Sequence, residues 1–147
     1  MNDAHLHLAI NHFPLIAPII ALIVLVYGFI SKSEQIKRVS YLIFVIGALS
    51  TIPSFKSGEA AEEVVEDMKE IQESYIEDHE EAAETFAVLS YVLGGFALIG
   101  FWASNKNLPL AKVFSFVIFF IALTTIFFGK ATGTTGGEIR HTEITPK

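Results

Sequence analysis

Apolar residues fill four long stretches of the chain that contain no charged residue. Each stretch is about as long as a helix that crosses the roughly 30 Å hydrocarbon core of a bilayer. They are Phe13–Ile30, Val39–Phe55, Thr85–Ser104 and Val113–Gly129. The pattern predicts an all-α membrane protein, a four-transmembrane-helix bundle that takes up residues 1–147 as a single domain.

The connection between the second and third stretches, residues 56–78, is acidic but has a periodicity of its own. Its apolar positions recur every three or four residues, and glutamates fill most of the positions between them. These apolar positions are Ala61, Val64, Val65, Met68, Ile71 and Tyr75. The spacing predicts an extra amphipathic surface helix over Gly58–Tyr75, lying along the membrane face or roofing the bundle.

A helix-start signal precedes the third apolar stretch. Asp78 can cap a helix, and Glu81, three residues later, can reach back in a capping box. This would place His79 in the first turn of the third transmembrane helix. Inside that helix a stripe of small residues, which would let a neighbouring helix approach closely, runs through Ala83, Ala87, Ser90, Gly94 and Ala97.

Composition supports the membrane assignment and limits the chemistry. Hydrophobic residues make up 52% of the chain, and the mean hydropathy is +0.50, more apolar than one small soluble core requires. The absence of cysteine excludes disulfides, thiolate metal sites, iron–sulfur clusters and covalently attached c-type haem. No nucleophile–base pair, phosphate-binding loop or zinc-protease signature is present, which favours a binding or electron-transfer protein over an enzyme.

Charge divides between the two sides of the predicted bundle. The short loops Ser31–Arg38 and Asn105–Lys112 carry five basic residues against one acid, a net +4. The opposite side carries five basic residues against fifteen acids, a net −10. Because lysine and arginine in short loops mark the cytoplasmic side, both termini are expected outside the cytoplasm.

All five histidines fall on the predicted extracytoplasmic side. His12 lies at the membrane boundary beside Pro14, and His79 lies at the matching depth on the third helix. In one continuous helix His5 and His12 would share a face, whereas His7 would point away from both. The pattern therefore predicts that His12 meets His79 and that His7 is free to change.

Four short motifs suggest a relationship to a known family. They are "HLHLAINHFP" at the first helix, "SGEAAEE" after the second, "DHEEAA" at the third and "GGEIRH" near the end. Together they resemble the bacterial membrane family known as domain of unknown function 2231. The chain departs from that pattern at Ser57-Gly58, where the family has Thr-Gly, and in the single residue, Arg140, between Ile139 and His141.

The resemblance implies a four-helix domain of the bacterial inner membrane, whose relatives are sometimes joined to Rieske or cytochrome c domains. It therefore points to electron transfer. The positions that it carries over are His12, Pro14, Gly58, His79, Gly136, Gly137 and His141.

The segment after the fourth stretch, residues 130–147, is rich in glycine and threonine. It is expected to be an extracytoplasmic tail that folds back over the mouth of the bundle, with Ile139 as an apolar anchor. In that position His141 would act as a ligand on a lid.

The histidines support three hypotheses. The first is a b-type haem protein with His12 and His79 as axial ligands, His141 or His5 as substitutes, and Arg140 pairing with a propionate. The second is a copper or zinc site built from three or four of the same histidines with Glu59 nearby. The third is a structural subunit of a larger membrane complex without a cofactor.

The expected partners follow from the apolar helices and from the acidic connection between the second and third of them. Membrane lipid would surround the four helices, and the acidic connection would attract a basic soluble cytochrome or a respiratory-complex partner. No nucleic acid is expected, and self-association is left open.

Overall fold

The computed structural model is helical throughout the residues that it describes, 2–66, 71–139 and 141, apart from short turns. Its helices are α1 (Asp3–Ile10), α2 (His12–Ile30), α3 (Glu34–Glu66), α4 (Glu73–Asn105) and α5 (Ala111–Glu138). Four stretches are long and apolar enough to cross a membrane: α1 together with α2, most of α3, and all of α4 and α5. The predicted all-α class with four such helices is confirmed.

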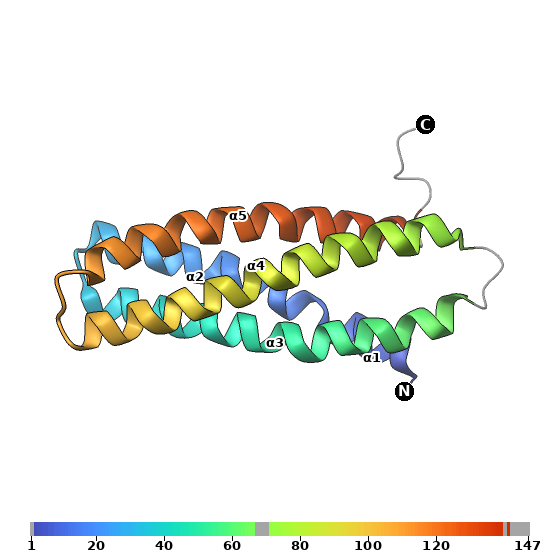
Figure 1. The fold of residues 1–147 in the computed structure, drawn as a ribbon, viewed down its shortest axis with the longest axis horizontal. Coiled ribbons are helices and arrows are strands. Elements are labelled where there is room, and N and C mark those ends of the chain that lie inside the picture. The colour runs from blue at the N-terminus through green and yellow to red at the C-terminus, as the bar shows by residue number, and fades with distance from the viewer. Residues whose placement is uncertain (1, 67–70, 140, 142–147) are drawn as a thin grey trace.

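Helices α2 to α5 form an antiparallel bundle (Figure 1). Each helix packs on the next along the chain, and contacts between α2 and α5 close the ring. The α2–α3 and α4–α5 turns lie at one end, here called the basic end, whereas α1, the end of α3, the start of α4 and the end of α5 lie at the other end. At that second end, here called the histidine end, the short α1 packs mainly on α3 and makes little contact with α2.

The bundle buries small and hydroxyl side chains and exposes large apolar ones. Its core combines Ala21, Leu25, Tyr41, Phe44, Leu93, Ala97, Ile118 and Ala122, and buried hydroxyls include Ser40, Thr51, Ser90, Ser115 and Thr125. Large apolar side chains point outward, among them Ile23 (65% exposed), Ile46 (62%) and Phe120 (63%). Water does not favour such a surface, whereas lipid tails do.

Interhelical hydroxyl pairs join the helices inside the bundle. Tyr41 and Ser115 link α3 to α5 with oxygens 2.7 Å apart, and Thr51 and Ser90 link α3 to α4 at 3.0 Å. Each pair satisfies polar atoms that would otherwise be buried without partners.

The predicted small-residue stripe lies where α4 crosses α3. Ala87, Ser90, Gly94 and Ala97 are all buried. A Cβ added at Gly94 would lie 2.5 Å from the Cβ of Ala48, whereas one added at the adjacent Gly95 would meet nothing within 4 Å. Gly94 therefore sets the separation of the two helices.

Gly94→Ala is expected to destabilise the bundle by about 1–3 kcal/mol, because the Cβ of Ala48 is fixed to its backbone and the helices must separate. Gly95→Ala is the matched control and should be neutral or stabilising by up to about 1 kcal/mol, since it only improves helix propensity. Denaturant unfolding in one detergent measures both variants. Equal stability of the two proteins would contradict the close contact.

The structure corrects three element boundaries. Residues 58–66 continue α3 instead of starting a separate amphipathic helix, and Met68 of that predicted helix lies outside the described residues. Helix α4 begins at Glu73 with Gln72 as its N-cap, so Asp78 does not cap it and His79 lies in its second turn. Helix α5 continues to Glu138, so most of the predicted tail's described part is helical. Burial of Ile76 at the start of α4 (8% exposed) shows that packing, not the capping signal, extends this helix.

Two matching turns cap helices at the basic end. After α2, the N–H of Lys32 bonds to the Phe29 carbonyl (3.2 Å) and the N–H of Ser33 to the Gly28 carbonyl (3.1 Å). After α4, the N–H groups of residues 107 and 108 bond in the same way to the carbonyls of residues 104 and 103. Both are Schellman motifs, whose central residue adopts the left-handed conformation that favours Gly or Asn. Asn107 fits this preference, but Lys32, also at φ 52°, does not.

Candidate functional site

A break in the first span separates α1 from α2 at Asn11. The side chain of Asn2 caps α1 by accepting a hydrogen bond from the His5 N–H (3.0 Å). Proline has no N–H and its ring crowds the carbonyl four residues earlier, so Pro14 disrupts the helix at Ile10. As a result, α1 can pack on α3 independently of α2, which sets the direction of the histidines that it carries.

His7 is the α1 histidine that faces α3. Its Nδ1 lies 3.2 Å from the Ser54 carbonyl oxygen and 3.1 Å from Ser57 Oγ. The Ser57 hydroxyl donates its own hydrogen to the Ser54 carbonyl (2.8 Å), so both oxygens act as acceptors toward the imidazole. This network assigns the proton of a neutral His7 ring to Nδ1 and leaves a lone pair on Nε2.

His79 on α4 is held in a corresponding way by α5. Its Nδ1 lies 3.2 Å from Thr135 Oγ1. The Thr135 hydroxyl donates to backbone carbonyls of α5, at 3.2 Å from Thr132 O and 3.3 Å from Ala131 O. Thr135 therefore accepts from His79, and the lone pair of a neutral His79 ring is again on Nε2.

The two imidazoles lie next to each other at the histidine end of the bundle. Their ring centroids are 6.5 Å apart and their planes are inclined at 73°. Two imidazoles on one metal ion, each bonded at about 2.0–2.1 Å, have ring centres about 6 Å apart. The spacing of His7 and His79 is therefore close to that of a two-histidine ligand pair.

Glycines allow both rings to lie against helix backbones. A Cβ at Gly58 would be 3.3 Å from His7 Cε1, and one at Gly136 would be 2.9 Å from His79 Cε1. Any larger residue at Gly136 would require the His79 ring to move. These glycines belong to the motifs "SGEAAEE" and "GGEIRH", so the structure brings each motif to one histidine.

Asn11 follows His7 by four residues and carries a buried polar atom. Its backbone N–H bonds to the His7 carbonyl (2.9 Å). Its Oδ1 is buried without a hydrogen-bond partner among the described residues. A buried polar atom left unpaired costs about 1–3 kcal/mol, so this oxygen is suited to accept a hydrogen bond from an added donor.

The other predicted site residues that the structure describes are more exposed than this pair. His5, His12 and Glu59 are exposed. His141 is also exposed, and its N–H bonds to the Gly137 carbonyl (3.0 Å). Arg140 lies outside the described residues. Within the described part of the chain, no three His, Cys, Asp or Glu side chains are grouped so that they could hold a metal ion.

The structure places His7, which the sequence argument left free to change, against His79, and His12 is exposed. The sequence argument took residues 5–12 as one helix; in the structure α1 ends at Ile10 and α2 begins at His12, with Asn11 between them at helical backbone angles (φ −63°, ψ −21°). The signal for this break was in the sequence, since Pro14 lies four residues after Ile10. Of the two acceptors that hold His7, Ser57 belongs to the motif "SGEAAEE", whereas Ser54 carries no recognisable sequence signal.

Neither a family model nor a curated protein nor a solved structure matches the chain. The functional assignment therefore depends on the geometry of His7 and His79 and on the character of the surface around the bundle.

Proposed function

We propose that the protein is an integral membrane protein of the bacterial inner membrane that binds haem b between His7 and His79 and takes part in electron transfer. The observation that carries the proposal is the pair of imidazoles whose Nδ1 atoms are both held by acceptors, which leaves both Nε2 atoms as ligands. Ligating histidines in proteins are held in this way through their second nitrogen.

The donor set favours haem over a bare ion. Haem b needs only two axial ligands from the protein, because the macrocycle supplies the other four. Copper or zinc held by protein alone takes three or four side chains, and the described residues bring together only two histidines here. Haem bound at this pair would supply one-electron redox chemistry.

Residues of two helices keep the ligands in place. Ser54 and Ser57 on α3 fix the direction of His7, and Thr135 on α5 fixes that of His79. Because α1, α3, α4 and α5 all contribute, the two Nε2 atoms are positioned by the assembled bundle and not by one segment. Such pre-positioning reduces the conformational entropy lost when a ligand binds.

The absorbance spectrum of the purified protein tests the proposal. Haem held by two histidines gives a Soret band that shifts on reduction, and the pyridine haemochrome assay measures the haem per chain. A protein that shows no Soret band after expression with haem supplied, and that binds none on titration, would overturn the proposal. It would instead favour a structural subunit or, if elemental analysis finds copper or zinc, a bare metal site.

The surface supports membrane insertion, and charge supports the orientation. Large apolar side chains cover the outside of the bundle, and the basic end carries the net +4 of the short loops. We infer that this end faces the cytoplasm, with both termini and the haem outside it. The exposed glutamates of the histidine end would then steer a basic soluble cytochrome toward the site.

Cysteine labelling is expected to show this orientation, and the chain has no cysteine of its own to interfere. Ser74→Cys in the first turn of α4 should react with a membrane-impermeant maleimide in intact spheroplasts. Ser33→Cys in the α2–α3 turn should react only after lysis. Labelling of Ser33→Cys but not Ser74→Cys before lysis would reverse the assigned orientation.

A further inference from the structure

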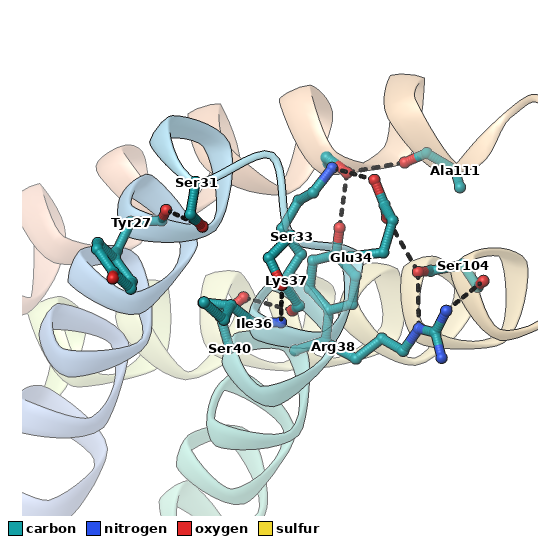
Figure 2. Close-up of polar contacts among 12 residues, drawn as sticks. Tyr27, Ser31, Ser33, Glu34, Ile36, Lys37, Arg38, Ser40, Ser104 and Ala111 are labelled. Carbon is teal, nitrogen blue, oxygen red and sulfur yellow. Dashed lines mark hydrogen bonds and ion pairs between the residues drawn. The ribbon is translucent and has the colours of Figure 1, made fainter.

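An open cleft lies at the basic end, between α2, α3 and α5. Its volume is about 330 Å³, and its lining includes Lys32, Lys37 and Lys112 together with Glu34 and the rings of Phe29 and Phe116. Figure 2 shows the polar side chains around the start of α3 at this end. None of these residues belongs to the histidine site.

The acid in the cleft is neutralised by its own neighbours. Glu34 Oε1 accepts from the buried Lys37 ammonium, and Oε2 accepts from the Ser104 hydroxyl at 3.1 Å (Figure 2). Ser104 in turn accepts from Arg38 Nε at 3.1 Å. Glu34 is therefore occupied by these groups and does not balance the remaining lysines.

Lys32 and Lys112 are exposed and form no ion pair among the described residues. Helices α3 and α5 also begin here, at Glu34 and Ala111, whereas α2 ends at Ile30 beside Lys32, so the helix dipoles partly offset one another and the two lysines supply the positive charge. The cleft thus presents two uncompensated ammonium groups and favours an anion.

The conformation of Lys32 is an independent indication that an ammonium group is needed. Lys32 occupies the left-handed position of a Schellman motif, where Gly would relieve the steric cost of a side chain. The matching position after α4 carries Asn107, a residue that tolerates this conformation. A lysine at such a position points to a role that the backbone itself does not require.

The floor and rim of the cleft are apolar and aromatic. The rings of Phe29 and Phe116 stack with centroids 5.2 Å apart. Tyr27 and Trp102, both more than half exposed, lie about one turn from the same ends of α2 and α4, as in an interfacial aromatic belt. Ile30 and Val113 beside the opening are exposed and would contact acyl chains.

We propose that this cleft binds the headgroup of an anionic phospholipid, with Lys32 and Lys112 on the phosphate and the acyl chains lying along α2 and α5. Basic pockets between transmembrane helices on the cytoplasmic side bind such headgroups. The inference rests on the membrane insertion in the proposed function but not on haem.

Lipid retention tests the proposal. The protein is purified in detergent from equimolar phosphatidylglycerol and phosphatidylcholine with the same acyl chains, and bound lipid is counted by native mass spectrometry. The wild type should retain phosphatidylglycerol preferentially. Lys32→Gly and Lys112→Ala should each reduce that preference about fivefold, and the double variant more than either, because each lysine near a lipid surface contributes about one such factor.

Two control variants distinguish loss of the cleft site from a general loss of positive charge and from a change at a left-handed turn position. Lys106→Ala removes a lysine that does not line the cleft, and Asn107→Gly changes the matched left-handed position. Both should keep the preference. Thermal unfolding should show that Lys32→Gly is at least as stable as the wild type. A reduced lipid preference in this variant is then not caused by unfolding.

Three results would overturn the proposal. They are an unchanged preference in the double variant, an equal loss in Lys106→Ala, and displacement of the lipid by millimolar inorganic phosphate, which would indicate a site for free phosphate. A chain that carbonate extracts from membranes would overturn both this inference and the membrane part of the proposed function. Absence of a Soret band would overturn the haem proposal alone.

Discussion

Replacing either His7 or His79 with alanine should reduce the haem retained by the purified protein roughly tenfold or more, whereas His5→Ala and His12→Ala should leave it unchanged. Each of the first two variants removes one of the Nε2 atoms of the pair, whose rings are 6.5 Å apart. Loss even of a residue that only orients a ligand typically costs 10–100-fold in affinity, so loss of the ligand itself costs at least about tenfold. The Soret absorbance per chain measures the effect.

The four histidine variants form a matched set. His5 and His12 are exposed histidines of the same N-terminal segment as His7, so they control for general loss of imidazole there. Circular dichroism and gel filtration in detergent should show all four variants folded. Loss of haem in His12→Ala but not in His7→Ala would restore the pairing predicted from the sequence and overturn the one assigned here.

Helix number and the close approach to α4 could be predicted from the sequence because each follows from local patterns. Four uncharged stretches of membrane-spanning length predict four helices, and the small residues of α4 predict where another helix approaches. Gly94 against Ala48 is that approach. Helix ends were predicted less well because they depend on contacts distant in sequence, such as the burial of Ile76, which extends α4 beyond Asp78.

The arrangement of the histidines also depends on contacts distant in sequence. The depth of His79 was inferred from the chain, and the structure places it at the histidine end. The choice between His7 and His12 depended on the direction of a helix that Pro14 interrupts, and on acceptors 47 and 50 residues away. Periodicity within one segment does not contain that information.

Glycines near the end of α5 led to the prediction of a tail after the fourth span, and one of them makes room for the His79 ring. Gly133, Gly136 and Gly137 suggested a flexible tail, because glycine is unfavourable within helices by about 1 kcal/mol relative to alanine. The helix nevertheless continues to Glu138. At Gly136 the missing side chain leaves the space in which the His79 ring lies, so this position serves the site at some cost to the helix.

Gly136→Ala should therefore separate stability from haem binding. The added Cβ would lie 2.9 Å from His79 Cε1 and 3.2 Å from its Nδ1, so the ring must turn away and its hydrogen bond to Thr135 is lost. Since the atoms in conflict belong to a side chain that can move, the fold tolerates the change and gains up to about 1 kcal/mol in helix propensity. Haem affinity should fall about 10–100-fold, the range found when a ligand loses its orienting partner.

Gly133→Ala is the control for this experiment, one turn earlier on the same helix. Its Cβ would lie 3.8 Å from Leu15 Cδ1, an ordinary contact, so it should bring the same gain in stability with haem affinity unchanged. Haem titration followed by the Soret band, together with thermal unfolding of the haem-free proteins, gives both quantities. If the two variants bind haem equally well, the orientation of the His79 ring in this structure is not required for haem binding. If Gly136→Ala alone unfolds, the glycine serves helix packing and not the ligand.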